Sequence, residues 1–180
     1  MIYFGADWHL GHNKIIEFCN RPFPDIDVMR DSFFYEWRSK VTKNDLVYLL
    51  GDIAFKNSYI DDLRELPGSK ILIRGNHDPD KFCNSDIWIA STHYAQIRID
   101  QRKIVLSHFP IEAWNGMRHG SIHLHGHTHN NTSHSIYPIH NRIDTGYDHT
   151  NQALSTLDEL LELQLREEVG NRFNRIMNSD

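Results

Sequence analysis

The chain alternates short runs of consecutive apolar residues with segments whose apolar positions recur at helical spacing. An apolar run that stops at glycine or a polar residue is typical of a buried strand. In the first half such runs occupy residues 2–6, 46–50 and 71–73. Helices are predicted between them over 14–19 (capped by Asn13), from Asp27 to about Val41, and from Asn57 or Ser58 to Leu66. In the second of these helices, Val28, Phe33, Phe34, Trp37 and Val41 supply the apolar face. The order β-α-α-β-α-β indicates an α/β fold.

The second half is richer in strands. Strands are predicted over 87–90, 95–99, 104–106, 122–124 and 142–144. A last helix follows Ser155 as N-cap and carries Leu157, Leu160, Leu161 and Leu165 on its apolar face. We expect one domain over residues 1–169 and a polar tail over 170–180, because no Pro/Gly/Ser-rich linker interrupts the chain. The pattern predicts an α/β sandwich of two packed sheets flanked by helices.

Composition narrows the class of protein. The 180 residues are 39% hydrophobic and 24% charged, which excludes disorder as the main state. The net charge of −5 predicts no strong non-specific binding of duplex nucleic acid. We expect no membrane helix and no signal peptide, since the apolar runs are short. Cys19 and Cys83 are too few for a disulfide framework, so a reducing, cytoplasmic setting is expected.

Histidine is unusually frequent. The chain has 13 histidines against 10 glycines, and eight of them lie between His119 and His149. Histidine is the commonest protein ligand of transition metals. The excess therefore indicates a metal site.

Five short polar clusters follow predicted strands. They are Asp7-Trp8-His9, Gly51-Asp52, Gly75-Asn76-His77-Asp78, Ser107-His108 and Gly126-His127-Thr128-His129. Ligands of α/β sheets bind beyond the carboxyl ends of the strands, where these clusters fall. In extended backbone, residues two apart project to the same side, so Asp7 with His9 and His127 with His129 can each address one ion or two adjacent ions.

Seven side chains are candidate metal ligands. They are Asp7, His9, Asp52, Asn76, His108, His127 and His129. This set is too large for one catalytic zinc, which takes three protein ligands and a water, and suffices for two ions that share a carboxylate. The donors suit Mn²⁺, Fe²⁺/Fe³⁺, Zn²⁺ or Ni²⁺.

Each cluster also has a purely structural interpretation. Asp7 after a strand is a common turn or N-cap residue, and Gly51-Asp52 is a common turn dipeptide. His108 fits a strand end equally well. All of these structural interpretations would have to hold at once, in this order along one chain. That coincidence is harder to explain than a single metal site, so the metal site is favoured.

The ordered set of five clusters resembles the calcineurin-like metallophosphoesterases, and most of all their small single-domain bacterial and phage members. The stretches 7–13, 20–23 and 122–129 carry the likeness to that subgroup. The resemblance implies a four-layer α/β/β/α sandwich of two mixed sheets. It also implies that Asp7, His9 and His129 hold one ion, that Asn76, His108 and His127 hold a second, and that Asp52 bridges them.

The same resemblance implies a reaction. A hydroxide that bridges the two ions attacks phosphorus, His77 assists the leaving oxygen, and Asp78 orients the His77 ring. We expect a phosphodiesterase, with possible monoester activity, that acts on a small nucleotide-like substrate. The alternatives are a nuclease, a protein phosphatase, or a non-catalytic scaffold that kept the fold.

Other polar residues near the clusters are candidates for substrate contacts. His12, Arg118 and His119 are the first choices, and His125 is placed two residues before a candidate ligand. Surface or hydrogen-bonded histidines are the alternative reading of His12, His119 and His123. His93, His134, His140 and His149 receive no role.

Overall fold

The first sheet is built around the N-terminal strand. The computed structural model describes residues 1–131 and 141–177, with side chains as far as residue 167 and at residue 169. The five strands lie in the order β4-β3-β2-β1-β9. They are β1 (Ile2–Gly5), β2 (Leu46–Leu49), β3 (Ser69–Ile73), β4 (Ala90–Thr92) and β9 (Ser155–Thr156). The first four pair in parallel, and β9 pairs antiparallel to β1.

The second sheet has four strands in the order β5-β6-β7-β8. They are β5 (Tyr94–Ile99), β6 (Arg102–Ser107), β7 (Ile122–His125) and β8 (Arg142–Asp144). Strands β5 and β6 form an antiparallel hairpin, and the other neighbours are parallel. Both sheets are therefore mixed.

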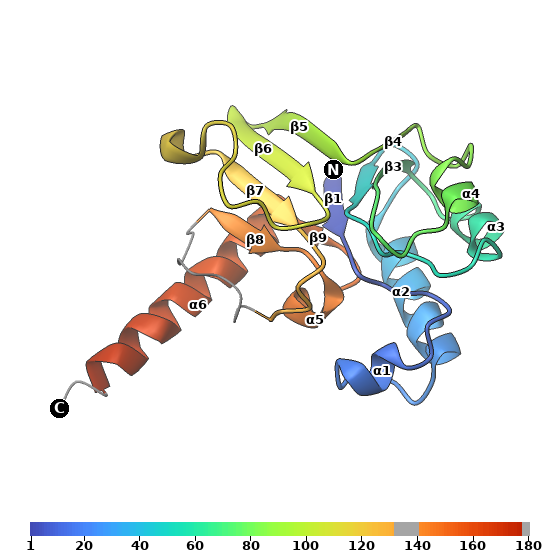
Figure 1. The fold of residues 1–180 in the computed structure, drawn as a ribbon, viewed down its shortest axis with the longest axis horizontal. Coiled ribbons are helices and arrows are strands. Elements are labelled where there is room, and N and C mark those ends of the chain that lie inside the picture. Colours follow the sequence, from blue (N-terminus) through green and yellow to red (C-terminus); the bar gives the residue numbers. More distant parts are fainter. Residues whose placement is uncertain (132–140, 178–180) are drawn as a thin grey trace.

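The helices lie around these sheets (Figure 1). They are α1 (Ile15–Phe18), α2 (Ile26–Lys40), α3 (Tyr59–Arg64), α4 (Asp80–Cys83), α5 (Tyr147–Thr150), α6 (Leu157–Met177) and the 3₁₀ helix η1 (Met117–His119). The C-terminal half of α6 extends away from the sheets in Figure 1.

Two apolar cores hold the layers together. In the first, Phe33 and Trp37 of α2 pack with Val47 and Leu72 on one face of the five-stranded sheet. The second lies between the sheets, where residues such as Leu50 meet residues of the four-stranded sheet. These apolar side chains are almost fully buried, and their removal from water is the main force that stacks the layers. The expected class, two packed mixed sheets flanked by helices, is confirmed.

Some local predictions were wrong. Helix α2 is capped by Asp25, whose side chain accepts from the N–H groups of Asp27 and Val28, so the helix begins earlier than expected. Val28, expected on the apolar face, is 44% exposed. The strand predicted over 87–90 forms at 90–92 instead, where the chain meets the edge of β3.

The last helix also differs in detail. Ser155 lies in β9, and Thr156 forms the capping pair with Glu159: each side chain accepts from the other residue's backbone N–H. Helix α6 then runs to Met177, past Gly170, where the polar tail was expected to begin. His134 and His140 lie outside the described residues. Among the described helices, none combines the length and apolar character that a membrane span requires.

Candidate metal centre

Asp7, His9 and His129 converge just beyond β1 and β7. His9 Nε2 lies 3.2 Å from His129 Nε2 and 3.9 Å from Asp7 Oδ1. The other oxygen of Asp7 accepts from the backbone N–H of His127 at 2.8 Å. This bond ties the loop after β7 to the end of β1 and leaves Asp7 Oδ1 facing the centre.

A second group forms beyond β2, β3, β6 and β7. Candidate ligand atoms of Asp52, His108 and His127 lie within 4.8 Å of one another. His108 Nδ1 donates to the carbonyl of Leu50 at 2.8 Å, so its Nε2 points into the group, 3.1 Å from Asn76 Oδ1. The described structure therefore brings all seven predicted ligands together.

Asp52 faces both groups. Its Oδ2 lies 3.7 Å from His9 Nε2 and 3.5 Å from His108 Nε2. Its Oδ1 is held by the backbone N–H of His77 at 2.8 Å. Asp52 is 1% exposed, so its carboxylate meets the two groups at the buried floor of the site.

The backbone at these positions is unusual. Five of the seven predicted ligands have positive φ: Asp7 (56°), His9 (53°), Asp52 (55°), His127 (72°) and His129 (48°). Non-glycine residues adopt this left-handed conformation rarely, and Asp, Asn and His tolerate it best. The tight turns let side chains two residues apart, such as Asp7 and His9, reach the centre from the end of a strand.

The donor atoms fit a cation. Asp7 Oδ1 is buried and has no hydrogen-bond partner among the described residues. In the second group the lone pair of His108 Nε2 meets two acceptors, Asn76 Oδ1 and Asp52 Oδ2. Acceptors that converge in a buried place need a positive charge between them, supplied by a metal ion or by protons.

The pKa values of the metal-free site also indicate that the converging acceptors require positive charge. Burial raises the pKa of Asp7 to about 8 and lowers the pKa of His9 to about 3. Burial opposes the charge of His129 as well, but its bond to Asp148 prevails and raises the pKa of His129 to about 10. Protons on Asp7 and His129 thus take up part of the role that a cation would fill.

His77 lies at the open side of the site. Its side chain is 48% exposed, and its Nε2 is 4.0 Å from Asp52 Oδ2. The ring stacks on Phe55, with centroids 4.8 Å apart and planes inclined by 19°. Phe55 was not singled out from the sequence.

Asp78 has a different place from the one expected. Its two oxygens accept from the backbone N–H groups of Asp52, Ile53, Ala54 and Gly75. It therefore fixes the turn that carries Asp52 instead of orienting the His77 ring. A carboxylate that satisfies several buried N–H groups stabilises such a turn strongly.

The residues predicted to touch substrate divide into two sets. His12 lies beside the site, with its ring 6.0 Å from that of His9 and 4.6 Å from that of Phe55. Arg118 and His119 are exposed on η1, which precedes β7, whereas the candidate ligands His127 and His129 follow the opposite end of β7. The structure does not bring these two residues to the centre.

His125 and His123 belong to the interior. Their rings contact each other at 5.4 Å, and His125 Nδ1 donates to the carbonyl of Gly126. His123 Nε2 accepts from the N–H of Ile111 at 3.0 Å, while its Nδ1 donates to the carbonyl of Val105. The hydrogen-bonded reading of His123 therefore holds.

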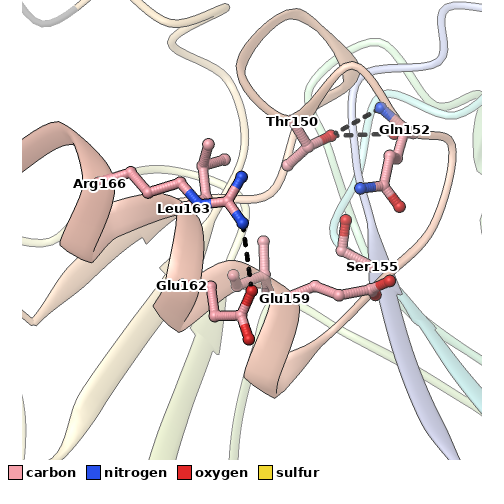
Figure 2. A pocket seen from close by; sticks show the side chains of 8 residues that line it. Thr150, Gln152, Ser155, Glu159, Glu162, Leu163 and Arg166 are labelled. Carbon is pink, nitrogen blue, oxygen red and sulfur yellow. Dashed lines mark hydrogen bonds and ion pairs between the residues drawn. The ribbon is translucent and has the colours of Figure 1, made fainter.

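A cavity of about 320 Å³ lies elsewhere, between α6 and the segment 150–155. Figure 2 shows Glu162 and Arg166 paired on α6 on one side of it and Thr150 and Gln152 on the other. None of the candidate ligands lines this cavity.

Three polar residues around the centre were missed. Asp144 accepts from Thr128 Oγ1 and from the N–H groups of Asn130 and Gly146. Asp148 and Arg21 form a buried ion pair beside His129. Asp144 ends a predicted strand, a position that carries ligands elsewhere in this chain, and that signal was available in the sequence.

Comparison with known proteins identifies relatives. No family model matches the chain. It is 34% identical to the "Uncharacterized protein MJ1445" of Methanocaldococcus jannaschii, over 72% of this chain and 70% of that protein. It is 30% identical to the "Gene 66 protein" of Mycobacterium phage D29, over 90% of this chain and 94% of the relative.

A solved structure supports the fold. The "Protein of Unknown Function AQ665" from Aquifex aeolicus superposes with a TM-score of 0.72 at 24% identity, covering 91% of this chain and 98% of that one. The fold of the AQ665 protein therefore matches the two-sheet architecture of this chain. By sequence, the chain belongs to the family that contains the MJ1445 protein of M. jannaschii and the Gene 66 protein of phage D29.

Proposed function

We propose that the chain is a phosphoesterase that uses two divalent transition-metal ions and cleaves phosphodiester bonds of a small, nucleotide-like molecule. The observation that carries the proposal is the position of Asp52. One buried carboxylate oxygen faces imidazole nitrogens of both donor groups, at 3.7 and 3.5 Å. A shared carboxylate between two donor groups is the arrangement of two-metal hydrolytic sites.

The assignment of ligands follows the two groups. One ion would be held by Asp7, His9 and His129, the other by Asn76, His108 and His127, with Asp52 shared between them. When bound, such ions activate water at neutral pH and neutralise charge that develops on phosphoryl oxygens. Mn²⁺, iron, Zn²⁺ and Ni²⁺ all suit this mixture of imidazole and oxygen donors.

His77 would handle the proton of the leaving group. It is exposed at the mouth of the site, and its backbone N–H is tied to Asp52. The ring is therefore placed beside the centre without being one of the converging donors. In this role His77 donates its proton to the departing oxygen, while Phe55 holds the ring by stacking.

A small substrate agrees with the surroundings of the site. The net charge of the chain is −5, and the exposed Arg118 on η1 lies at the other end of β7. A long nucleic acid needs many cationic contacts along its backbone, and these features do not supply them. Monoesters, nucleic acids and phosphoproteins are kept as further substrates in the test.

The test begins with metal-free protein prepared with chelator. We expect no hydrolysis of bis(p-nitrophenyl) phosphate or of 2′,3′-cyclic nucleotides until Mn²⁺ is returned, and two ions per chain by elemental analysis at full activity. Asp52→Asn should weaken both ions. His119→Ala, which changes an exposed histidine on η1 at the other end of β7 from His127 and His129, is the matched control and should behave as wild type.

The outcomes separate the alternatives. Activity with one ion per chain would contradict the shared role of Asp52. Two bound ions without hydrolysis of any diester, monoester, oligonucleotide or phosphopeptide would indicate the non-catalytic scaffold. If oligonucleotides were hydrolysed much faster than cyclic nucleotides, the chain would be a nuclease. If phosphopeptides were hydrolysed much faster, it would be a protein phosphatase.

A further inference from the structure

Arg21 and Asp148 form a buried ion pair next to the candidate centre. Arg21 Nε donates to Asp148 Oδ1 and Nη2 donates to Oδ2, both at 2.7 Å. The same guanidinium donates to the carbonyls of Asp7 at 2.6 Å and Trp8 at 3.1 Å. Arg21 is 5% exposed, so these partners, and not water, compensate its charge.

Such a pair is poor evidence of stability alone. Taking both charges out of water is costly, and apolar residues of the same volume often stabilise a protein as well or better. The position of the pair suggests another use. It joins the turn after α1 to the start of α5 and to the end of β1, three segments that surround His129.

Asp148 also contacts His129 directly. Its Oδ2 accepts from His129 Nδ1 at 2.6 Å. An ionised carboxylate can only accept, so the proton of this bond lies on Nδ1. The Nε2 atom then points toward His9 Nε2, 3.2 Å away, in the group formed with Asp7.

The loop that carries His129 needs such a contact. His129 has φ of +48° and Asn130 of +60°, and the ring is not enclosed, since a quarter of the side chain is exposed. A ring on a turn of this kind can rotate unless its second nitrogen is held. Asp148 is itself immobilised by two bonds from Arg21.

A metal ion between Cys19, His129 and Asp148 is a different reading of the same atoms. Candidate donor atoms of these residues also lie within 4.8 Å of one another. Both oxygens of Asp148 are already bonded to Arg21, and 2.6 Å between Nδ1 and Oδ2 is a hydrogen-bond distance. The trio is therefore a hydrogen-bonded contact.

We infer that Asp148, held by Arg21, is a positioning residue that orients His129 so that its Nε2 serves the ion site shared with Asp7 and His9. The inference rests on the metal site of the proposed function. A carboxylate on the second nitrogen of a metal-binding histidine fixes the ring and increases its basicity, and its loss typically costs about 10- to 100-fold in metal affinity.

The experiment measures Mn²⁺ binding without substrate, by electron paramagnetic resonance of the free ion. Asp148→Asn should weaken one of the two ions by about 10- to 100-fold. The His129→Asn variant lacks the ring; its asparagine suits the left-handed backbone and does not reach Asp148. Adding Asp148→Asn to this variant should change its Mn²⁺ affinity by no more than about twofold. Asp144→Asn is the matched control, a buried carboxylate that bonds the same loop through Thr128 and Asn130.

Any loss of Mn²⁺ affinity caused by Asp144→Asn should be the same in the His129→Asn background, because Asp144 does not act through the His129 ring. The inference is overturned if folded Asp148→Asn binds Mn²⁺ as wild type does, or if its loss is the same in both backgrounds. Should Asp148→Asn fail to fold, combining it with Arg21→Met leaves no unpaired buried charge and carries the same expectation. Absence of hydrolysis with intact Mn²⁺ binding would contradict the proposed function and leave this inference standing.

Discussion

At the scale of single residues, four of the seven candidate ligands are held by a second contact that leaves one donor atom facing the centre. His108 is fixed by the carbonyl of Leu50, and His129 by Asp148. The spare oxygens of Asp7 and Asp52 accept backbone N–H groups. The donors are thus arranged before any ion binds, which lowers the entropy cost of binding.

His77 should separate proton delivery from metal binding. We expect His77→Ala to keep two ions and to lose about 10²- to 10⁴-fold in rate on an alkyl phosphodiester. The loss should be smaller on a nitrophenyl ester, because a phenolate departs without a proton. Rates on both substrates and elemental analysis of the variant test this. An equal loss on both substrates would contradict proton donation.

His123 should make stability depend on pH. Burial lowers the pKa of His123 to about 4, whereas the unfolded chain has the ordinary value near 6.5. As pH falls through this window the unfolded state takes up a proton that the folded state refuses, so stability is lost. Between pH 7 and pH 5 the loss from this one group is about 2 kcal/mol.

Urea unfolding of chelated protein at the two pH values measures this effect. His123→Gln should be less stable at pH 7, because it disturbs the bonds to Ile111 and Val105, but should lose less on acidification. His119→Gln, an exposed change, should show the wild-type pH dependence. The same acid loss in all three proteins would exclude His123 as its source.

At the scale of elements, the ends of the strands depend on one another. A Cβ atom added at Gly75 would lie 2.2 Å from the backbone nitrogen and from Oδ1 of Asp52. The turn of Asp52 cannot easily yield, because Asp78 holds three of its N–H groups. Close approach of two loops, not φ, is what requires glycine here.

Gly75→Ala should therefore displace Asp52. We expect a loss of about 1–3 kcal/mol in the free energy of unfolding and a clear loss of Mn²⁺ affinity. Gly120→Ala is the control: its φ is +78°, but nothing lies within 4 Å of the added atom. It should cost some stability and leave Mn²⁺ binding unchanged. Unchanged Mn²⁺ binding in Gly75→Ala would contradict the close contact.

The elements also show how far sequence reasoning reaches. Strands β1, β2, β3, β6, β7 and β8 were predicted within one or two residues. The first four contain apolar runs that end at a polar cluster, which makes them easy to locate. The seven converging side chains were identified for the same reason. Short helices α4 and α5 were missed, since a single turn leaves no periodicity to read.

The supporting contacts were harder to foresee. Asp148 lies 19 residues from His129 and 127 from Arg21, so nothing local in the sequence links them. Asp78 stands next to His77 in sequence but binds the turn of Asp52 instead. Such pairings follow from the packing of the strand ends, which periodicity does not specify.

At the scale of the whole molecule, the centre lies where strand ends of the two sheets meet. Asp7 and Asp52 follow strands of the five-stranded sheet, whereas His108 and His127 follow strands of the four-stranded sheet. An ion held by both sets crosslinks the sandwich at one edge. Metal binding should therefore stabilise the whole domain and not only the loops.

Thermal unfolding tests this coupling. At 100 times the dissociation constant a ligand adds about 2.7 kcal/mol, and for a domain of this size each kcal/mol raises Tm by about 2–4 °C. Mn²⁺ should thus raise Tm by about 5–10 °C over chelated protein, and by less in Asp52→Asn. No rise in wild type at millimolar Mn²⁺ would contradict an ion that joins the sheets.

The left-handed backbone of five predicted ligands has a consequence for comparing relatives. Asp, Asn and His are the residues that this conformation tolerates best after glycine, and they are also good donors for cations. A chain that no longer bound ions would still tend to keep these residue types at positions 7, 9, 52, 127 and 129. Asn76 and His108 have ordinary φ, so the backbone does not favour their identities. Those two positions are therefore the more informative markers of retained ion binding among relatives.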